Sequence, residues 1–141
     1  GERVPDFTLS TPDGKEVNFY RFVKGKKCVI LDFWASWCIP CRVSIIFLRE
    51  IYKTHGDSIR FISISLDQQE ADWQKALKEE KLPWAQFRSL PEQTKTFTEQ
   101  YNLIGIPAFF IIDSEGRIVF SGSSMNELTE QLPKMITNST H

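Results

Sequence analysis

The sequence predicts an α/β domain built on a mixed β-sheet flanked by helices. Three observations support this fold class. The run Cys28–Phe33 is almost continuously apolar, which is typical of a strand covered on both faces. Helix-like and strand-like segments alternate after it, as a parallel sheet requires. Two later strands, Ala108–Ile112 and Arg117–Phe120, are joined by the tight turn Ser114–Gly116, which predicts an antiparallel pair.

A β-hairpin is predicted at the start of the chain. Apolar residues alternate with polar ones on either side of the turn Pro12–Gly14. These apolar residues are Phe7, Leu9, Val17 and Phe19. Gly25 and Lys26 then separate the hairpin from the apolar strand.

The central segments predict a β-α-β unit. Cys38–Thr54 has mixed apolar spacing without glycine, which suits a helix, and His55-Gly56 ends it. Phe61–Leu66 alternates apolar residues with serine, which predicts the next strand. Strands joined by a crossover helix run parallel. Because the C-terminal hairpin adds antiparallel strands, the sheet is expected to be mixed.

The second half of the chain predicts three more helices and one loop. Glu70–Glu80 has the pattern of an amphipathic helix. Residues 83–91 begin and end with proline and are expected to form a loop. A further helix is expected over Gln93–Tyr101, and a closing helix over Met125–Ile136, with Pro133 near its end.

Length and composition fit one globular domain. The 141 residues are 41% hydrophobic and 13% aromatic, which is enough apolar material for a core. Because 17 basic residues nearly balance 18 acidic ones, nucleic acid and anionic membrane surfaces are not expected partners. The apolar run Ile104–Ile112 is far shorter than the roughly 20 residues of a membrane-spanning helix. The chain begins at Gly1 and not at Met, so residues 1–141 are expected to be one domain excised from a longer anchored or multidomain protein.

Two of the three cysteines form the motif Cys38-Ile39-Pro40-Cys41, where a predicted strand gives way to a predicted helix. The free N–H groups and the dipole at a helix N-terminus favour a thiolate at Cys38. Cys41 lies one turn later and is close enough to close a small disulfide ring. The pair therefore suits two-step exchange, in which Cys38 attacks a partner disulfide and Cys41 resolves the mixed disulfide.

Three other interpretations compete with redox exchange. A zinc site needs two more ligands, and the chain offers only Cys28 and two histidines, none in a metal-ligand spacing. Two inert buried cysteines are disfavoured by the position between strand and helix. A peroxide-reducing cysteine, as in the peroxiredoxins, is expected to have Thr or Ser three positions earlier, where this chain has Ala35. Redox exchange is therefore favoured.

The segment Asp32–Cys41 resembles the active-site stretch of the thioredoxin superfamily. Gly105-Ile106-Pro107 is similar to the cis-proline loop of that superfamily. The opening Pro5–Leu9 with Asp13-Gly14 resembles the TlpA/ResA branch of thiol-disulfide oxidoreductases, which is related to the AhpC/TSA redoxins. The resemblance covers nearly the whole chain. It implies a thioredoxin-like fold with an N-terminal β-hairpin and an inserted segment, residues 66–101, before the cis-proline loop.

Asp32 interrupts the apolar strand that leads to Cys38. A buried carboxylate without a partner is costly and has a raised pKa, so we expect Asp32 to accept the proton of Cys41 during exchange. The resemblance implies the same role. Thioredoxins pair this carboxylate with a lysine, but the strand Phe61–Leu66 offers only serine and apolar residues. Thioredoxins also have a kinking proline where this chain has Ile46, which implies a straighter helix.

The resemblance implies a cis peptide bond before Pro107. Such a bond would place the backbone of Ile106 next to Cys38, where it can pair with an extended substrate segment. Trp37 is expected to form an exposed apolar rim for partner docking. The predicted substrate-binding residues are Trp37, Ile39, Pro40, Ile106 and Pro107.

Other notable residues have more ordinary interpretations. Trp34 is expected to pack in the interior, and Cys28 is expected to be a plain core residue. Members of the ResA type also place an acidic residue near the active site. The candidates for that position are Asp67, Gln68 and Glu70.

These observations predict an enzyme, a thiol-disulfide oxidoreductase that exchanges a Cys38–Cys41 dithiol with protein substrates. The resemblance implies a reductant outside the cytoplasm, in a bacterial periplasm or envelope, supplied by an upstream electron donor. No metal or organic cofactor is expected, because the dithiol carries two electrons itself, and a monomer is sufficient. Two alternatives stay open. One is a non-catalytic binding module that uses the surface of Trp37 and Pro107, and the other is a thiol peroxidase.

Overall fold

In the computed structural model, which describes residues 3–139, seven strands form one sheet in the order β2-β1-β5-β4-β3-β6-β7. The strands are β1 (Thr8–Ser10), β2 (Glu16–Asn18), β3 (Cys28–Trp34), β4 (Arg60–Ser65), β5 (Ala85–Ser89), β6 (Ala108–Asp113) and β7 (Ile118–Gly122). The helices are α1 (Tyr20–Val23), α2 (Ile39–His55), α3 (Glu70–Glu80), α4 (Pro91–Gln100) and α5 (Met125–Ser139).

The sheet is mixed, as the sequence predicts. Strands β3, β4 and β5 run parallel, with α2 and α3 as the crossover connections. Strand β6 is antiparallel to β3, and β7 is antiparallel to β6. The N-terminal hairpin of β1 and β2 joins the other edge by antiparallel pairing of β1 with β5. Both predicted hairpins and the predicted parallel pair are therefore confirmed.

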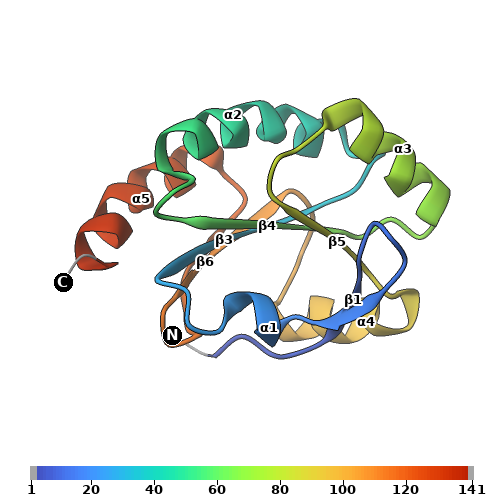
Figure 1. Ribbon diagram of the computed structural model, residues 1–141, viewed down its shortest axis with the longest axis horizontal. Helices are drawn as coiled ribbons and strands as arrows, with labels where there is room; N and C mark the ends of the chain where they lie inside the picture. The colour runs from blue at the N-terminus through green and yellow to red at the C-terminus, as the bar shows by residue number, and fades with distance from the viewer. Residues whose placement is uncertain (1–2, 140–141) are drawn as a thin grey trace.

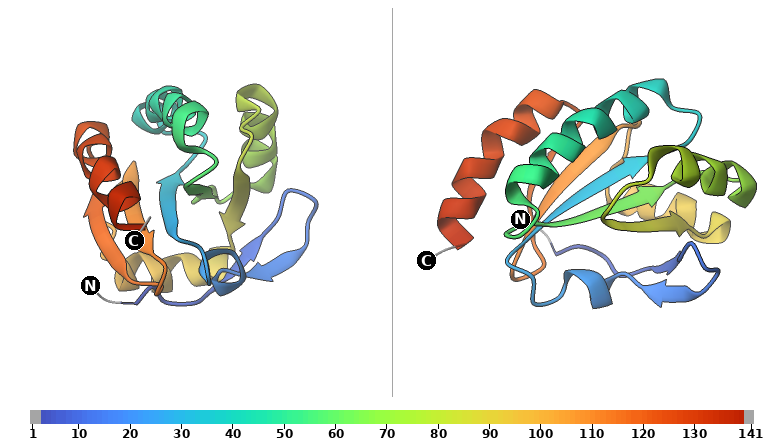
Figure 2. Two further views of the ribbon diagram at one scale, coloured as in Figure 1. Left: turned by 60° about the vertical axis from the view of Figure 1, so that its left-hand side comes forward. Right: turned by 45° about the horizontal axis from the view of Figure 1, so that its top comes forward.

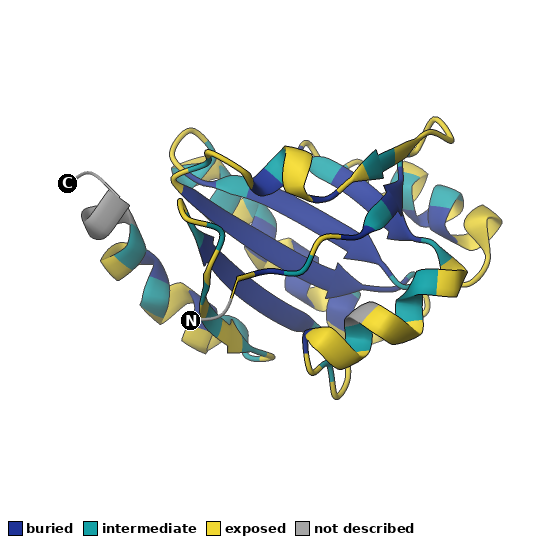
Figure 3. Ribbon diagram, turned by 90° about the horizontal axis from the view of Figure 1, so that it is seen from below, coloured by how far each residue is buried: buried dark blue, intermediate teal, exposed yellow. Residues whose placement is uncertain are grey.

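Helices cover both faces of the sheet. Helices α2, α3 and α5 lie on the upper face in the view of Figure 1, and α1 and α4 lie on the lower face. The two turned views show the same layers, with α4 separated from α2 by the sheet (Figure 2). Seen from below, the central strands are buried along their length (Figure 3). Coverage on both faces explains why β3 is apolar at nearly every position.

Strand alternation divides β3 between the two faces. Val29, Leu31 and Phe33 pack in the lower cluster, where the rings of Tyr101 and Phe110 contact Phe33. Ile30 and Trp34 belong to two separate clusters on the upper face. Asp32 lies between them in the strand, so its side chain is directed to the upper face, under α2. A carboxyl group is thereby buried away from solvent, next to Ser63 of β4.

Strand β5 corrects one prediction, because it lies within residues 83–91, where the sequence predicts a loop. Only Ala85 and Phe87 face the lower apolar cluster. Gln86 and Arg88 are polar but buried on the opposite face. The segment therefore lacks the apolar pattern of an interior strand, and pairing with β4 and β1 determines its structure.

The helices agree with the predictions more closely. Helix α3 has the predicted bounds, whereas the short α1 carries no pattern that predicts it. Helix α4 begins at Pro91, which is favourable because a first-turn residue needs no N–H partner. Helix α5 continues through Pro133. Over the described residues, no helix combines the length and apolarity that crossing a bilayer requires.

Candidate active site

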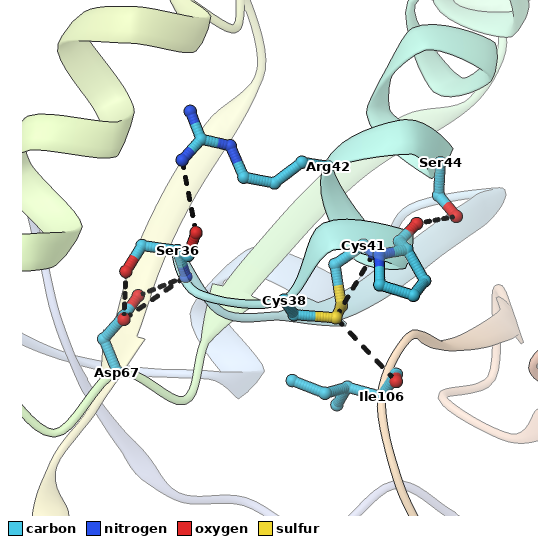
Figure 4. Close-up of a disulfide and its surroundings, with 8 residues drawn as sticks. Ser36, Cys38, Cys41, Arg42, Ser44, Asp67 and Ile106 are labelled. Atoms are coloured by element: carbon cyan, nitrogen blue, oxygen red, sulfur yellow. Dashed lines mark hydrogen bonds between the residues drawn. A yellow bond between two sulfur atoms is a disulfide. The ribbon is translucent and has the colours of Figure 1, made fainter.

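Cys38 and Cys41 are joined by a disulfide at the N-terminus of α2, with their Cα atoms 5.2 Å apart. Cys38 is the N-cap of α2, and its Sγ accepts a hydrogen bond from the backbone N–H of Cys41 at 3.2 Å (Figure 4). That N–H and the positive end of the helix dipole stabilise negative charge on Cys38. Cys38 is 5% exposed and Cys41 is 1% exposed, so Cys38 is the sulfur that a partner reaches first.

The loop that precedes Cys38 is fixed by Asp67, which follows β4. The Asp67 carboxylate accepts hydrogen bonds from the Ser36 N–H at 3.0 Å and from the Ser36 hydroxyl at 2.6 Å (Figure 4). It also accepts a hydrogen bond from the Ser65 hydroxyl at 2.5 Å. Asp67 is almost fully buried, so these bonds replace the water that its charge has lost.

Arg42 fixes the same loop from the helix side. Its Nη1 donates to the carbonyl oxygen of Ser36 at 3.2 Å (Figure 4). Its other nitrogens form ion pairs with Glu79 and Glu80 of α3, at 3.2 Å and 3.0 Å. Glu80 also pairs with Arg49 at 3.0 Å. The cation next to the disulfide is therefore already paired with carboxylates.

The peptide bond between Ile106 and Pro107 is cis, as the resemblance implies. The carbonyl oxygen of Ile106 lies 3.9 Å from the Cys38 Sγ, on the side of the disulfide opposite Asp67 (Figure 4). The predicted meeting of the Ile106 backbone and Cys38 is thus present in the structure. A groove of about 810 Å³ runs beside this loop, and its lining includes Pro40, Ser44 and Ile104.

Apolar side chains stand exposed around the disulfide. Trp37 is 68% exposed, Ile39 is 76% exposed, and Ile104, across the groove, is 96% exposed. Exposed apolar groups at a reactive site are typical of surfaces that dock other proteins. Trp34, by contrast, is fully buried, which confirms its predicted packing role. No sequence pattern predicts a role for Ile104 at this site, because its proximity to Pro40 depends on the fold.

Asp32 is 2% exposed and lies beside the buried Ser63, its partner in β4. Burial raises the pKa of its carboxyl from 3.8 to about 7, although a hydrogen bond from Ser63 opposes part of that shift. The Ser63 Oγ donates to Oδ2 of Asp32 at 3.1 Å, and Oδ1 has no hydrogen-bond partner. A carboxylate with this pKa can accept a proton near neutral pH. The cross-strand partner of Asp32 is Ser63, and β4 contains no lysine.

The remaining predicted residues are the candidates for the acidic position and Cys28. Of the three candidates for the acidic position, Asp67 is buried at the loop, whereas Gln68 and Glu70 are exposed. Cys28 is a buried free thiol at the opposite end of β3, and burial followed by the nearby Asp113 raises its pKa to about 11. No group of three or more potential metal ligands occurs among the described residues.

A model of the Redoxin family matches residues 1–135. The chain is 26% identical over 140 residues to thiol-disulfide oxidoreductase ResA of Bacillus thuringiensis subsp. konkukian, covering 97% of this chain and 78% of that protein. The fold matches the thioredoxin domain of a thiol-disulfide oxidoreductase from Bacteroides vulgatus with a TM-score of 0.87, 31% identity and 96% coverage of both chains. It also matches a thiol:disulfide interchange protein from Bacteroides sp. with a TM-score of 0.85 and 29% identity, covering 97% of this chain and 90% of that one.

Proposed function

The chain belongs to the Redoxin family and is a TlpA/ResA-like thiol-disulfide oxidoreductase of the thioredoxin superfamily, and on this premise we propose that it reduces disulfide bonds of protein substrates outside the cytoplasm. The observation that carries the proposal is the position of the Cys38–Cys41 disulfide. It lies at a helix N-terminus, against the Ile106 carbonyl and beneath an exposed apolar rim.

The proposed reaction has two exchange steps. The thiolate of Cys38 attacks one sulfur of the substrate disulfide, and the other substrate sulfur leaves as a thiolate that takes a proton from water. Cys41 then loses its proton and attacks the Cys38 sulfur, which breaks the mixed disulfide and releases the second substrate thiol. The substrate gains two electrons and the enzyme is left as the Cys38–Cys41 disulfide. An upstream thiol donor restores the dithiol.

Burial assigns the two cysteines their proposed roles. Cys38 is the nucleophile, because it caps the helix and is the more exposed sulfur. Cys41 is the resolving thiol, because it is buried behind Cys38. Its proton needs an acceptor away from solvent, and Asp32 is a buried carboxylate with a pKa near neutrality. We assign that role to Asp32.

A protein substrate fits the surroundings of the disulfide. The backbone groups of Ile106 can pair with an extended substrate segment, as an exposed sheet edge does. Trp37 and Ile39 can then cover apolar side chains on either side of the substrate cysteine. The groove beside Pro107 continues this surface. The dithiol carries the electrons, so the proposed reaction needs no metal or organic cofactor and no second subunit.

The proposed direction of electron flow rests on the absence, among the described residues, of an unpaired positive charge beside Cys38, whose thiolate is stabilised by the Cys41 N–H and the helix dipole alone. Ile39 and Pro40 carry no charge, and the guanidinium of Arg42 is already paired with two glutamates. A strongly stabilised thiolate makes the disulfide form of such a pair a strong oxidant, so surroundings without an added charge favour a pair that works as a reductant. The resemblance to the TlpA/ResA branch supports a site of action outside the cytoplasm.

A mixed-disulfide trap tests the proposal. Cys41→Ser should capture a disulfide-bonded protein substrate through Cys38, as a covalent species that dithiothreitol releases. Cys38→Ser should capture none, and Cys28→Ser should behave like the wild type, because Cys28 is buried far from the site. If Cys41→Ser binds the substrate without a covalent bond, the chain is a binding module. If it reacts only with peroxide, the thiol peroxidase alternative replaces the proposal.

A further inference from the structure

We infer that Trp84 and Ser63 are positioning residues for Asp32, joined to it in a buried hydrogen-bonded relay that fixes the orientation of its carboxylate. The inference rests on the proposed role of Asp32 as the proton acceptor for Cys41. Trp84 lies directly before β5, and no sequence motif connects it with the cysteines.

The relay consists of two hydrogen bonds that share the Ser63 hydroxyl. The indole Nε1 of Trp84 donates to the Oγ of Ser63 at 2.8 Å, and the Oγ of Ser63 donates to Oδ2 of Asp32 at 3.1 Å. All three side chains are buried, with exposed fractions of 8%, 0% and 2%. No hydrogen bond within the relay therefore competes with bulk water, and each bond has its full effect on the next.

The donor chemistry gives the relay a direction. An indole N–H can only donate, so the Ser63 oxygen must accept from Trp84. The single hydroxyl proton of Ser63 is then directed to Asp32. This leaves Oδ1 as the oxygen of Asp32 without a hydrogen-bond partner. One oxygen is held, and the other is available for a proton.

The fold fixes both ends of the relay. Ser63 is the cross-strand partner of Asp32 in the parallel β3–β4 pair, so the two side chains are neighbours on the same face. The Trp84 indole packs against the rings of Tyr52 in α2 and Phe61 in β4, with ring centroids 5.3 Å and 5.4 Å away, and these two rings also contact each other. These contacts hold its N–H toward Ser63.

The relay brings no charge to Asp32. On the same face of the sheet, β4 contributes Ser63 and Ser65, β5 contributes Gln86 and Arg88, β6 contributes Phe109, and α2 contributes Cys41. Arg88 donates to the backbone oxygen of Asp67 at 3.4 Å. Thioredoxins place a lysine beside this carboxylate, whereas this chain uses a neutral hydroxyl. Neutral donors steady the carboxylate and oppose the effect of burial only in part.

The test is a titration of Asp32 in the oxidised protein, followed by ¹³C NMR of the carboxyl carbon. In this form Cys38 and Cys41 do not titrate, so exchange activity is not needed for the measurement. Ser63→Ala should raise the pKa of Asp32 by about one unit, because it removes one hydrogen bond to a charged group. Trp84→Phe should raise it in the same direction by about half a unit, because the free hydroxyl can turn away.

Three further variants make the test specific. Trp84→Phe added to Ser63→Ala should cause no further shift, because the indole acts only through the serine. Ser63→Thr keeps a hydroxyl at this position, so it should leave the pKa of Asp32 at its wild-type value, unlike Ser63→Ala. Trp73→Phe is the matched control, because Trp73 is a buried tryptophan whose Nε1 has no hydrogen-bond partner, and it should leave the pKa unchanged.

The pH profile for closure of the Cys38–Cys41 ring should move by the same amount as the pKa of Asp32. An unchanged titration in Ser63→Ala, or equal effects of Trp84→Phe with and without Ser63, would overturn the relay whatever the activity. A shifted titration with an unmoved pH profile would overturn the role of Asp32 in exchange. Failure of the proposed function is recognised separately, because the wild type itself would then not reduce any protein disulfide.

Discussion

The Asp67 carboxylate accepts both the backbone N–H and the hydroxyl of Ser36, a residue 31 positions earlier in the chain. This pair joins the end of β4 to the loop that leads into Cys38. The other side-chain contact described for this loop is the hydrogen bond from Arg42 to the Ser36 carbonyl oxygen, and Trp37 beside it is exposed. Reactivity of Cys38 should therefore depend on a carboxylate that never contacts its sulfur.

Asp67→Asn should lower the free energy of unfolding by about 2 kcal/mol and slow the reaction of Cys38 with a disulfide substrate. The amide can accept from one serine group but presents an N–H to another donor, so at least one buried charge-assisted bond is lost. Urea unfolding and stopped-flow exchange kinetics measure the two effects. Asp113→Asn is the control, because Asp113 accepts two backbone N–H groups in the β6–β7 turn, away from the cysteines. Equal kinetics in both variants would contradict the role of Asp67.

Asp32 should make the oxidised protein less stable as the pH rises from about 4 to 7. Its pKa is 3.8 when exposed and about 7 in the fold, so in this range the unfolded chain releases a proton that the folded protein retains. The penalty is absent below pH 4, grows to about 4 kcal/mol near pH 7 and stays there above it.

Asp32→Asn removes this titration. Urea unfolding of both oxidised proteins should be measured between pH 4 and 8. As the pH rises, the unfolding free energy of the variant should increase relative to that of the wild type by about 4 kcal/mol. A constant difference in unfolding free energy across the range would show that the folded carboxyl titrates like an exposed one.

Trp37→Ala should reduce kcat/KM for a protein disulfide by about 10- to 100-fold, the usual effect of removing an aromatic anchor at an interface. Exchange with a small disulfide such as oxidised glutathione should change less than about twofold, because such a substrate needs no docking surface. Phe47→Ala is the matched control, since Phe47 is an exposed aromatic farther along α2. Parallel losses on both substrates would mean that Trp37 acts on the cysteines and not on docking.

Local sequence patterns are sufficient to predict the main features of the site. The cysteine spacing, the strand before it and the resemblance of residues 105–107 placed Cys38, Cys41 and the cis bond before Pro107. The isolated charge in an apolar strand identified Asp32 as buried with a raised pKa. Each of these signals lies within a few residues of the feature that it predicts.

Features that depend on distant pairing could not be predicted in this way. Ser63 is the neighbour of Asp32 only through the register of β3 and β4. Trp84 reaches Ser63 because β5 enters the sheet beside β4, whereas the sequence predicts a loop over that segment. Gln86 and Arg88 interrupt the apolar pattern of that strand, because they are buried on the face of the sheet opposite the lower apolar cluster.

The reduction potential of the Cys38–Cys41 pair tests the central claim most directly. Equilibration with defined thiol/disulfide buffers should show a reversible two-electron couple near or below about −250 mV, comparable to the value of about −270 mV for thioredoxin. A potential near −120 mV, as in the strong oxidant DsbA, would make the protein a disulfide donor and contradict the proposed reductive role. Failure to form any reversible disulfide would contradict the exchange mechanism itself.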